Sequence, residues 1–589
     1  MFQQRMVTLR QEMAVLGLKG LLVTLEDRFL SKSVPAHDNW VRHLTGFEGS
    51  AAQVLLIAED CFLLTDARYA AEAAKQLNPD GIRVFDTQDK KLSVLLQEQI
   101  MGGGNLGVCF WRISAGFFLT LQKSVPSVVL VDFPEEIVRI FTLWGQDDAA
   151  KAKKQLGHAY TIDTTAMAQI RLESARSLFK DETIFFQGRP DAISWLLGLR
   201  AEGIPFVPLL PSYGLLTKDM LYIWCDVERV PPDVQKSCGP GISFYPLQSI
   251  NDMLPNLLGG RTFSCDADKT PHALVANLKA QGVDVTFQPD PMLELQAQKS
   301  ADDKIALEAA QLKEAVAFSH LWFQVTQAIQ RGERLSEWDV VQRLETIRKR
   351  DAHYKGPSFP TIAGFGPNSA LIHYRPTPEK NLILSKESVL LVDAGGHYLP
   401  AATTDTTRVF YLGTTPSDDV KGIYTRLLKG FIAYASLVFP EGVPGCALES
   451  AARKPLWEVA ADYPHATGHG VGTFLNVHEY PTLSTRSMAT LKPGNSITLE
   501  PGYYKTGAFG MRLEDRLWVH RADAAGFLNF EDITFIPFDP LLVDQVLLTM
   551  AEKEWLRTYH QAIADKLLPL LDGTDVQSWI QEKIQAFLS

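Results

Sequence analysis

The sequence has few cysteines and no long apolar run. Its 589 residues include six cysteines, which lie far apart and form no Cys-x-x-Cys pair. Buried reduced thiols are the expected state of such residues, and they fit a cytoplasmic protein. No stretch of about 18 uninterrupted apolar residues occurs, so we expect no membrane span. Near the start, Met6, Leu9, Met13 and Leu16 recur at helical spacing and predict an amphipathic helix, not a signal peptide.

The sequence also lacks an excess of positive charge. It has 57 Lys and Arg residues against 68 Asp and Glu residues, which gives a formal net charge of -11. A phosphate backbone repels such a protein, so we expect no nucleic-acid partner. No low-complexity tract appears. The chain is too long to fold around one hydrophobic core, since domains contain roughly 100 to 200 residues.

Two segments of the first half resemble each other. The first reads "TLRQEMAVLGLKGLLV" and then "WVRHLTGF", and the second reads "QIRLESARSLFKDETIFF" and then "ISWLLGLR". Each predicts a helix, a short apolar strand and a Leu-x-Gly sequence that ends at Gly46 or Gly198, and strand-like runs follow both. The pattern predicts two related α/β domains, over residues 1–160 and 161–295. Helix–strand units are common, so chance similarity is the alternative.

A domain boundary is expected near residue 295. The segment "FQPDPMLELQAQKSADDKIALEAA" contains two prolines and then Ser300 and Asp303, in the Ser-x-x-Asp spacing that starts a helix. The third predicted domain covers residues 296–589. It contains the segment "HATGHGVGTFLNVHE", which places three histidines within fourteen residues.

Two aspartates of this third domain are candidate metal ligands. The segment "SVLLVDAGGHYLPAATTDTTRVFYLG" is an apolar strand ending in Asp393, a turn rich in small residues, and Asp405 before a second apolar strand. This pattern predicts a hairpin that holds two carboxylates close together.

A histidine and two glutamates extend the set of candidate ligands. His469 lies between Gly468 and Gly470, which allow unusual backbone angles and close approach. Glu500 and Glu514 lie on two strand-like segments joined by a Gly-rich turn, in "SITLEPGYYKTGAFGMRLEDRLWV".

The charges of these five residues support grouping them. An unpaired buried ion costs several kcal/mol, so four buried carboxylates need cations. Two divalent ions cancel four carboxylates, and a neutral imidazole adds a ligand without charge. Such a site suits manganese, cobalt or zinc, and carboxylates can bridge two ions about 3.5 to 4 Å apart. Taken singly, each carboxylate is more often a turn, cap or solvated strand end, and a lone histidine more often belongs to the core.

The order of these residues carries a resemblance to a known family. The motifs "GPNSALIHY", "TTDTTRV", "HATGHGVGTFLNVHE" and "LEPGYY" with "GAFGMRLED" closely resemble those of the pita-bread metallopeptidases. Among these, the chain is most similar to the long, three-domain Xaa-Pro aminopeptidases (aminopeptidase P). The resemblance covers nearly the whole chain, through "LTGFEGSA", "DARY", "DAISWLLGLR", "SFPTIAGF", "LNFEDITFIPF" and "WLRTYH". It implies two related α/β domains followed by a pita-bread catalytic domain with a C-terminal extension.

The resemblance also implies a role for each candidate ligand. Asp393 would chelate one metal ion, Asp405 and Glu514 would bridge both ions, and His469 and Glu500 would complete the second. Manganese is the expected metal, with zinc or cobalt as alternatives. A hydroxide between the ions would attack the Xaa-Pro bond, and a nearby carboxylate, for which we name Glu500, would manage its proton.

Further residues match positions that hold the substrate in this family. His373, His465 and His478 match its non-ligand histidines, which contact the substrate and the tetrahedral intermediate. Arg512 matches the arginine of the family's R-x-E motif and is expected to support the bridging Glu514 and to bind substrate. The resemblance further implies a homodimer formed through the catalytic domain.

The implied reaction removes the N-terminal residue from peptides whose second residue is proline. The peptide bond that precedes proline has no N–H, and the proline ring fixes the local backbone. Peptidases that bind an extended substrate through this N–H therefore lose a hydrogen bond. A prolidase-like dipeptidase is the alternative enzyme. A non-catalytic peptide- or histone-binding relative is the alternative from another class, although such relatives lack the metal ligands.

Three departures from the family pattern bear on the pocket. Pro400, Ala401 and Ala402 lengthen the spacing between the first two ligands to twelve residues, where the family has eleven, and a one-residue bulge would leave both in place. Ala466 replaces a common glycine. Tyr480 stands where a small residue is usual, and it is expected to narrow the pocket beside His478.

Overall fold

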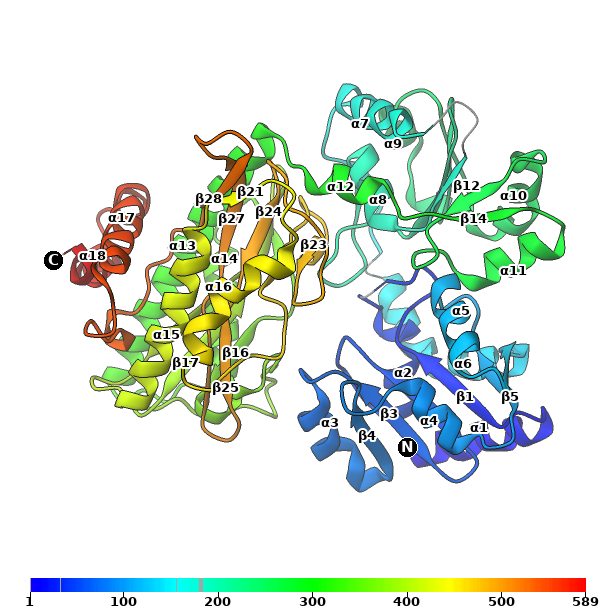
Figure 1. Cartoon of the computed structure of the whole chain (residues 1–589), viewed down its shortest axis with the longest axis horizontal. Coiled ribbons are helices and arrows are strands. Elements are labelled where there is room, and N and C mark those ends of the chain that lie inside the picture. Colours follow the sequence, from blue (N-terminus) through cyan, green and yellow to red (C-terminus); the bar gives the residue numbers. More distant parts are fainter. Residues whose placement is uncertain (1, 32, 155, 180–183, 589) are drawn as a thin grey trace. The chain divides into compact units, whose positions relative to one another are not determined.

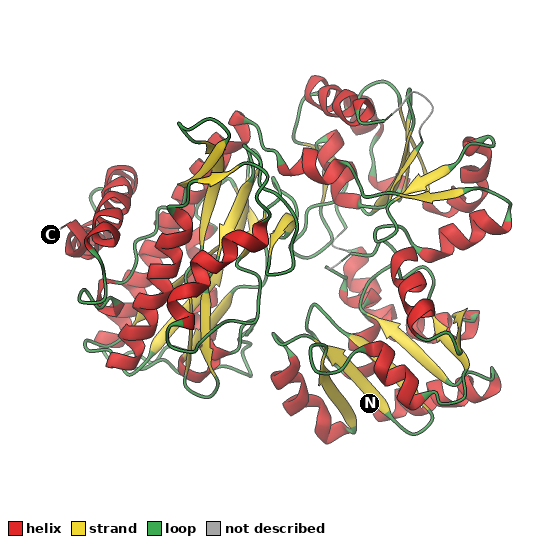
Figure 2. Ribbon diagram, viewed as in Figure 1, coloured by secondary structure: helices red, strands yellow, loops and turns green. Residues whose placement is uncertain are grey.

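The computed structural model describes residues 2–31, 33–154, 156–179 and 184–588. The chain divides into two compact units, Met1–Leu295 and Gln296–Ser589. Both units combine helices with β-sheets (Figure 2). Among the described residues, no helix has the length and apolar character needed to cross a membrane.

The first unit begins with a six-stranded sheet in the order β4-β3-β2-β1-β5-β6 (Figure 1). Neighbours β1–β2 and β2–β3 are antiparallel, and the remaining pairs are parallel. The strands are β1 (Gly20–Thr24), β2 (Gln53–Ile57), β3 (Cys61–Thr65), β4 (Ile82–Asp86), β5 (Gly104–Val108) and β6 (Val128–Asp132). The helices of this half are α1 (Phe2–Val15), α2 (Trp40–Thr45), α3 (Ala70–Leu77), α4 (Leu92–Gln99), α5 (Ala115–Ser124) and α6 (Glu135–Lys153). Helix α1 buries Met6, Leu9 and Met13, as their spacing predicts, whereas Leu16 follows the end of the helix and is half-buried.

A second six-stranded sheet repeats this topology in the order β12-β11-β10-β8-β13-β14. Its β8–β10 and β10–β11 pairs are antiparallel and its other pairs are parallel, as in the first sheet. The strands are β8 (Phe185–Gln187), β10 (Ser212–Leu216), β11 (Leu221–Cys225), β12 (Ile242–Pro246), β13 (Phe263–Cys265) and β14 (Val285–Phe287). The helices of this half are α7 (Thr165–Ser177), α8 (Pro190–Leu197), α9 (Pro232–Ser237), α10 (Ile250–Leu258), α11 (His272–Ala280) and α12 (Met292–Ala297), and a short ladder joins β7 (Ala159–Thr161) to β9 (Leu199–Ala201). The prediction of two related α/β domains is confirmed.

The repeated Leu-x-Gly sequence has a structural reason. Gly46 ends helix α2 and Gly198 ends helix α8, and both adopt the left-handed conformation, with φ of 81° and 62°. Glycine is favoured at such a helix end because it has no Cβ to clash. Each glycine therefore ends the helix that lies between the first two strands of its six-stranded sheet in chain order.

The second unit opens on the long helix α13 (Ala301–Gln330). Ser300 and Asp303 form the predicted capping box at its start. The other helices are α14 (Glu337–Arg348), α15 (Asp418–Ala435), α16 (Gly445–Trp457), α17 (Met550–Leu567) and α18 (Asp575–Leu588). Helices α13, α15 and α16 lie alongside the strands of this unit (Figure 1). Their apolar faces form one core together with the sheets.

The sheets of the second unit are mostly antiparallel. They run β16-β17-β20, β15-β18-β19, β25-β26 and β21-β28-β27-β24-β22-β23. The strands are β15 (Tyr354–Pro357), β16 (Ile362–Phe365), β17 (Val389–Ala394), β18 (Gly396–Tyr398), β19 (Ala402–Thr403), β20 (Thr406–Tyr411), β21 (Phe439–Pro440), β22 (Gly468–Gly470), β23 (Glu479–Leu483), β24 (Ser496–Leu499), β25 (Gly502–Lys505), β26 (Phe509–Arg512), β27 (Asp515–Arg521) and β28 (Phe527–Asp532). A single bridge between Thr407 and Glu514 joins the sheet of β20 to the sheet of β27.

The extra residue near Pro400 lies in a turn. Strand β17 pairs with β20, and β18 pairs with β19 through His397 with Thr403 and Tyr398 with Ala402. Neither ladder contains a register shift, so the expected β-bulge is absent from both. The three residues from Leu399 to Ala401 form the connection and absorb the added length. The hairpin itself, predicted from the two apolar segments, is present.

Candidate metal centre

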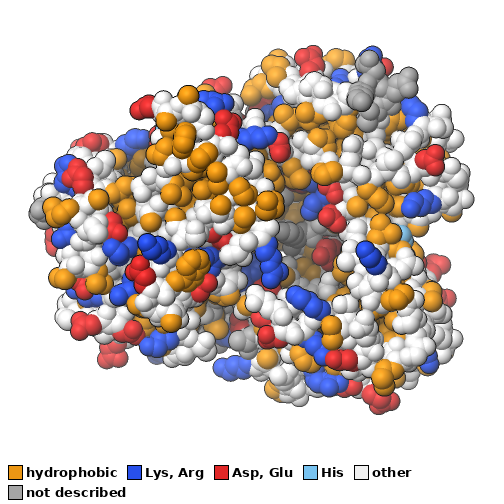
Figure 3. All heavy atoms as spheres, in the orientation of Figure 1, with side chains coloured by type: hydrophobic (Ala, Val, Ile, Leu, Met, Phe, Trp, Pro, Cys, Tyr) orange, Lys and Arg blue, Asp and Glu red, His pale blue; other side chains and the backbone are white. Residues whose placement is uncertain are grey.

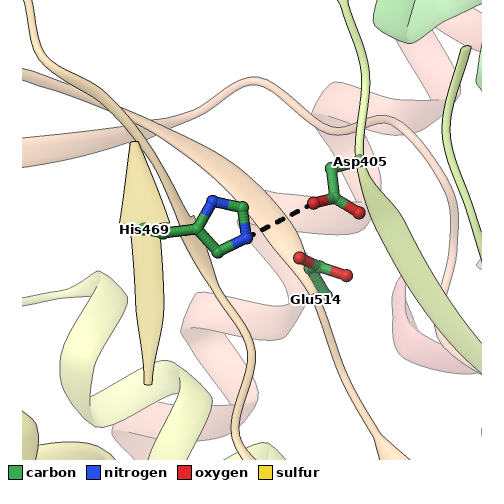
Figure 4. A group of neighbouring side chains, drawn as sticks. All are labelled: Asp405, His469 and Glu514. Atoms are coloured by element: carbon green, nitrogen blue, oxygen red, sulfur yellow. Dashed lines mark ion pairs between the residues drawn. The ribbon is translucent and has the colours of Figure 1, made fainter. Parts of the chain in front are cut away.

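Five predicted ligands come from different strands of the second unit. Their positions are Asp393 on β17, Asp405 directly before β20, His469 on β22, Glu500 directly after β24 and Glu514 directly before β27. The side chains of Asp405, His469 and Glu514 point toward one another (Figure 4), and their ligand atoms all lie within 4.8 Å of one another. All five positions are buried except that of Glu500, which is partly exposed.

His469 presents one ring nitrogen to the carboxylates. Its Nδ1 lies 2.8 Å from the Gly470 carbonyl oxygen, to which it donates a hydrogen bond. Its Nε2 lies 3.5 Å from Asp405 Oδ2 and 3.7 Å from Glu500 Oε1. Burial lowers the pKa of His469, but the hydrogen bond to Asp405 and the charges of Glu500 and Asp405 outweigh it, so the pKa is raised. A cation, either a proton or a metal ion, is therefore favoured between Nε2 and the carboxylates.

The glycines beside His469 permit close packing of neighbouring strands. A Cβ on Gly468 would lie 2.0 Å from the Thr498 carbonyl oxygen, and one on Gly470 would lie 2.2 Å from that of Tyr480. Neither glycine has a positive φ. The close approach that these glycines allow is present, and the left-handed backbone angles that they also allow are not used.

The carboxylates repel one another in a buried space. Burial raises the pKa of Glu514 well above its usual value, and the charges of Asp405, Glu500 and Asp393 raise it further. Burial also raises the pKa of Glu500 to about 7 and that of Asp393 to about 6, even though the charge of Arg512 lowers both. The protein alone therefore does not compensate this negative charge.

The donor set fits divalent cations. Asp393 Oδ1 is buried and has no hydrogen-bond partner among the described residues. Such an orphaned acceptor costs about 1 to 3 kcal/mol unless another group binds it. Four carboxylates and one imidazole are the oxygen-rich, one-nitrogen donors that manganese, cobalt and zinc accept. The residues present thus agree with the two-ion site that the sequence predicts.

A whole β-hairpin, and not only the predicted Gly-rich turn, lies between Glu500 and Glu514 in the chain. The β25–β26 hairpin is inserted between them, while β24 pairs with β27 through Leu499 and Asp515. This pairing places both glutamates at the same end of two adjacent strands. The intervening hairpin carries Arg512.

Arg512 contacts one predicted ligand directly and another through a threonine. Its Nη2 lies 2.5 Å from Asp393 Oδ2, and its Nε donates to Thr407 Oγ1 over 3.1 Å. Thr407 Oγ1 in turn donates to Glu514 Oε2 over 2.8 Å. Sequence reasoning did not single out Thr407, although it lies within the quoted motif "TTDTTRV".

Tyr504 connects Arg512 to His465 and was also missed. Arg512 Nη1 donates to the Tyr504 hydroxyl over 2.7 Å, and that hydroxyl lies 2.9 Å from His465 Nε2. His465 Nδ1 lies 2.7 Å from the Ala466 carbonyl oxygen, so Nδ1 carries the proton of the neutral ring. Tyr504 therefore donates to Nε2. The residue lies in "LEPGYY", but nothing in the sequence shows that its side chain returns to His465.

The other predicted substrate residues lie at different distances from this centre. The exposed His478 has its ring centroid 4.3 Å from that of His469. His373 lies in the turn after the 3-10 helix Gly366–Ala370 and is partly buried. That 3-10 helix contacts the strand of Arg512, because Gly510 N donates to Ser369 Oγ over 2.7 Å. Tyr480 is partly exposed on β23.

Comparison with known families agrees with the fold. Residues 307–521 match metallopeptidase family M24, and residues 526–587 match the C-terminal region of peptidase M24. Residues 5–140 and 163–303 each match a creatinase/prolidase N-terminal domain. Fold and site together define a metallopeptidase of the pita-bread type.

Relatives cover the chain from end to end. A probable Xaa-Pro aminopeptidase P of Laccaria bicolor is 31% identical over 98% of this chain and 93% of its own length. One of Fusarium vanettenii is 31% identical over 98% of both chains. The chain therefore belongs to the Xaa-Pro aminopeptidase P group of metallopeptidase family M24.

Solved structures show the same architecture. The X-prolyl aminopeptidase of Caenorhabditis elegans, described as a cytosolic enzyme with a di-nuclear active site, superposes with a TM-score of 0.91 at 24% identity and covers 99% of both chains. A Xaa-Pro dipeptidase from Bacillus anthracis covers 63% of this chain, with a TM-score of 0.52 at 22% identity.

Proposed function

We propose that this metallopeptidase releases the N-terminal residue from peptides whose second residue is proline, and that it uses two divalent metal ions. The observation that carries the proposal is the geometry of His469. Its Nδ1 donates to a carbonyl while its Nε2 faces Asp405 and Glu500. This is the arrangement by which proteins orient a metal-binding imidazole.

The five clustered residues would hold both ions. Asp393 would bind the first ion, His469 and Glu500 the second, and Asp405 and Glu514 would bind both. We propose manganese as the metal, with zinc or cobalt as alternatives, because these ions accept carboxylate oxygens and one imidazole nitrogen. Bound ions of this kind polarise a carbonyl oxygen and lower the pKa of water toward neutrality.

The remaining residues of the site would act on the peptide. His465 is held by Tyr504 on one ring nitrogen and by a backbone carbonyl on the other. A histidine fixed in this way can stabilise charge or move a proton at the reacting bond. We assign the same substrate-contacting role to His478 and His373. We propose that Glu500, whose Oε1 lies 3.7 Å from His469 Nε2, accepts and returns the proton of the attacking water.

Arg512 would position ligands and contact substrate. Its guanidinium pairs with Asp393 and, through Thr407, supports Glu514. The fork of donors fixes both carboxylates in one geometry, which a flexible lysine would not do. We propose that Tyr480, on the strand that follows His478, narrows the entrance for the substrate.

The broader organisation is part of this proposal. We propose domain limits of 1–160, 161–295 and 296–589, which agree with the division of the chain after Leu295. We also propose that the protein is cytoplasmic, because the C. elegans relative is described as cytosolic.

We further propose that two chains form a homodimer through the catalytic unit. In the view of Figure 3, apolar side chains gather over part of the catalytic unit. The catalytic unit exposes Val438, Trp457 and Val459 at 56%, 48% and 41%. Apolar side chains gathered on an exposed surface are typical of protein contacts.

Hydrolysis of a matched peptide pair tests the activity. We expect release of the first residue from Xaa-Pro-Yaa tripeptides, dependence on added manganese, and loss of release after chelation. A Xaa-Pro dipeptide is the control, because a prolidase would prefer it. Tripeptide hydrolysis that continues undiminished in metal-free protein would refute the proposal, and cleavage of the dipeptide alone would establish the prolidase alternative.

A further inference from the structure

The C-terminal segment reaches the interior of the catalytic unit through one tyrosine. Helix α17 begins at a capping box formed by Thr549 and Glu552 and buries Tyr559 in its middle. The ring of Tyr559 stacks on Phe538 and on Trp555, with centroid distances of 5.1 Å in both cases. These ring contacts do not involve the hydroxyl group, so they would hold the ring in place even if the hydroxyl were removed.

The Tyr559 hydroxyl joins two charged side chains. It accepts a hydrogen bond from Arg408 Nη2 over 2.9 Å and donates one to Asp515 Oδ2 over 2.7 Å. Arg408 Nη2 also pairs with Asp515 Oδ1 at 2.6 Å. Both charged side chains are fully buried. Removal of the hydroxyl would leave a buried donor and a buried acceptor without this partner.

Arg408 holds the main chain beside the proposed metal ligand. Its Nη1 donates to the Glu514 carbonyl oxygen over 2.9 Å and to the Thr407 carbonyl oxygen over 3.0 Å. Glu514 N donates to Thr407 O over 3.1 Å, so the same two residues also form the single bridge between the two sheets. The Arg408 guanidinium therefore holds the main chain at the bridge between Thr407 and Glu514, from which the Glu514 side chain extends.

Asp515 adds a second connection to that junction. It directly follows Glu514 in the chain, so the hydroxyl of Tyr559 is connected to the Glu514 backbone by two routes, through Arg408 and through Asp515. Hydrogen bonds to charged, buried partners are the strong ones, and networks of them fix geometry. A bridging carboxylate needs such fixed geometry because it must meet two ions at once.

We propose that Tyr559 is a positioning residue through which the C-terminal helix α17 holds the backbone of Glu514 in place for binding two cations. This inference rests on the proposed role of Glu514 as a ligand of both ions. It assigns to the C-terminal extension a part in metal affinity, in addition to its part in the apolar core.

The test compares two conservative variants of the full-length protein. Tyr559→Phe removes the hydroxyl and keeps the stacked ring. Tyr434→Phe is the matched control, because Tyr434 is also buried in the same unit and its hydroxyl has no hydrogen-bond partner among the described residues. Manganese titration by calorimetry gives the affinity and number of bound ions, and thermal melting of chelated protein reports the fold.

For Tyr559→Phe we expect the weaker ion to bind roughly tenfold to a hundredfold less tightly, from the loss of one buried hydrogen-bonded group next to charged partners. At limiting manganese, kcat should fall by a similar factor while KM stays unchanged, and excess manganese should restore kcat in part. Tyr434→Phe should titrate like the wild-type protein.

Two results would overturn the inference. The first is a Tyr559→Phe variant that binds both ions as tightly as Tyr434→Phe, including the case in which only its melting temperature falls. The second involves Glu514→Gln, measured in parallel. If that variant keeps both ions at full affinity, the ligand role of Glu514 fails and this inference fails with it. Loss of an ion in Glu514→Gln with intact affinity in Tyr559→Phe refutes the role of Tyr559 alone.

Discussion

Replacing Glu514 with glutamine removes one of the four negative charges of the proposed centre. In the metal-free protein, burial and the neighbouring carboxylates raise the pKa of Glu514 well above its usual value, which favours the protonated side chain. Glutamine has nearly the shape of the protonated acid, and its oxygen can still accept the hydrogen bond from Thr407. The metal-free fold should therefore tolerate the change.

The metal-bound state should respond differently. Two unit charges about 4 Å apart interact by about 4 kcal/mol at an effective dielectric constant of about 20, so a doubly charged ion loses about 8 kcal/mol. The raised pKa of Glu514 makes the loss of its proton on metal binding unfavourable in the wild-type protein, which offsets part of this loss. A remaining loss of about 4 kcal/mol corresponds to about a thousandfold in affinity for at least one ion.

Thermal melting with and without manganese separates these two effects. We expect Glu514→Gln to melt close to the wild-type temperature in chelator, to lose most of the stabilisation by manganese, and to retain almost no turnover of a Xaa-Pro-Yaa peptide. Elemental analysis should find fewer than two ions per chain. A variant that holds two ions with near-normal turnover would remove Glu514 from the centre. A large loss of stability in chelator would contradict the expectation that the metal-free fold tolerates glutamine at this position.

Two further predictions concern the same centre. His465→Ala and His478→Ala should each lower turnover by roughly a hundredfold or more while two ions remain bound, which peptide hydrolysis and elemental analysis would show, and loss of metal would contradict their assignment as substrate contacts. Because the pKa of Glu500 is about 7 and that of Asp393 about 6, metal binding should release protons near neutral pH and weaken as the pH falls through this range. Calorimetry in two buffers of different ionisation enthalpy measures the release, and equal heats in both would refute it.

The raised pKa values also set the pH dependence of the metal-free fold. A carboxyl group whose pKa is higher in the folded than in the unfolded chain stabilises the fold below the unfolded pKa, and this contribution is lost as the pH rises through the folded value. For Glu500 the loss runs from the ordinary glutamate range up to about 7. Metal-free protein should therefore become less stable over this interval, and bound cations should remove the effect.

Local signals in the sequence were sufficient for much of the architecture. The Ser300 and Asp303 pair predicted the start of α13 because a capping box depends only on residues three apart. The strands of Asp393 and Asp405 followed from two apolar runs around a turn. The repeated domains followed from helix–strand patterns that recur at Gly46 and Gly198, where the chain needs the same left-handed helix end.

Contacts between distant segments were beyond such reasoning. Tyr504 lies four residues after Glu500, yet its hydroxyl meets Arg512 and His465 because the β25–β26 hairpin folds back toward the centre. The longer turn that contains Pro400 was likewise missed. A β-bulge and a longer turn both add one residue, so the spacing between the ligands does not distinguish them. Sequence spacing fixes how many residues lie between two ligands but not the path between them.

Two buried arginines, Arg512 and Arg408, hold different parts of the chain around Glu514. Arg512 contacts the side chains of the centre, whereas Arg408 contacts the carbonyl oxygens of Thr407 and Glu514 behind it. A carboxylate that binds two ions keeps its position only if both its oxygens and its backbone are held. Rotation of the side chain or movement of the main chain would take its oxygens away from the ions. Thr407 serves both layers: its hydroxyl accepts from Arg512 and donates to Glu514, and its carbonyl accepts from Arg408. Thr407→Val, which keeps the backbone bonds and loses only the hydroxyl, therefore separates the contribution of the side-chain layer from that of the backbone layer.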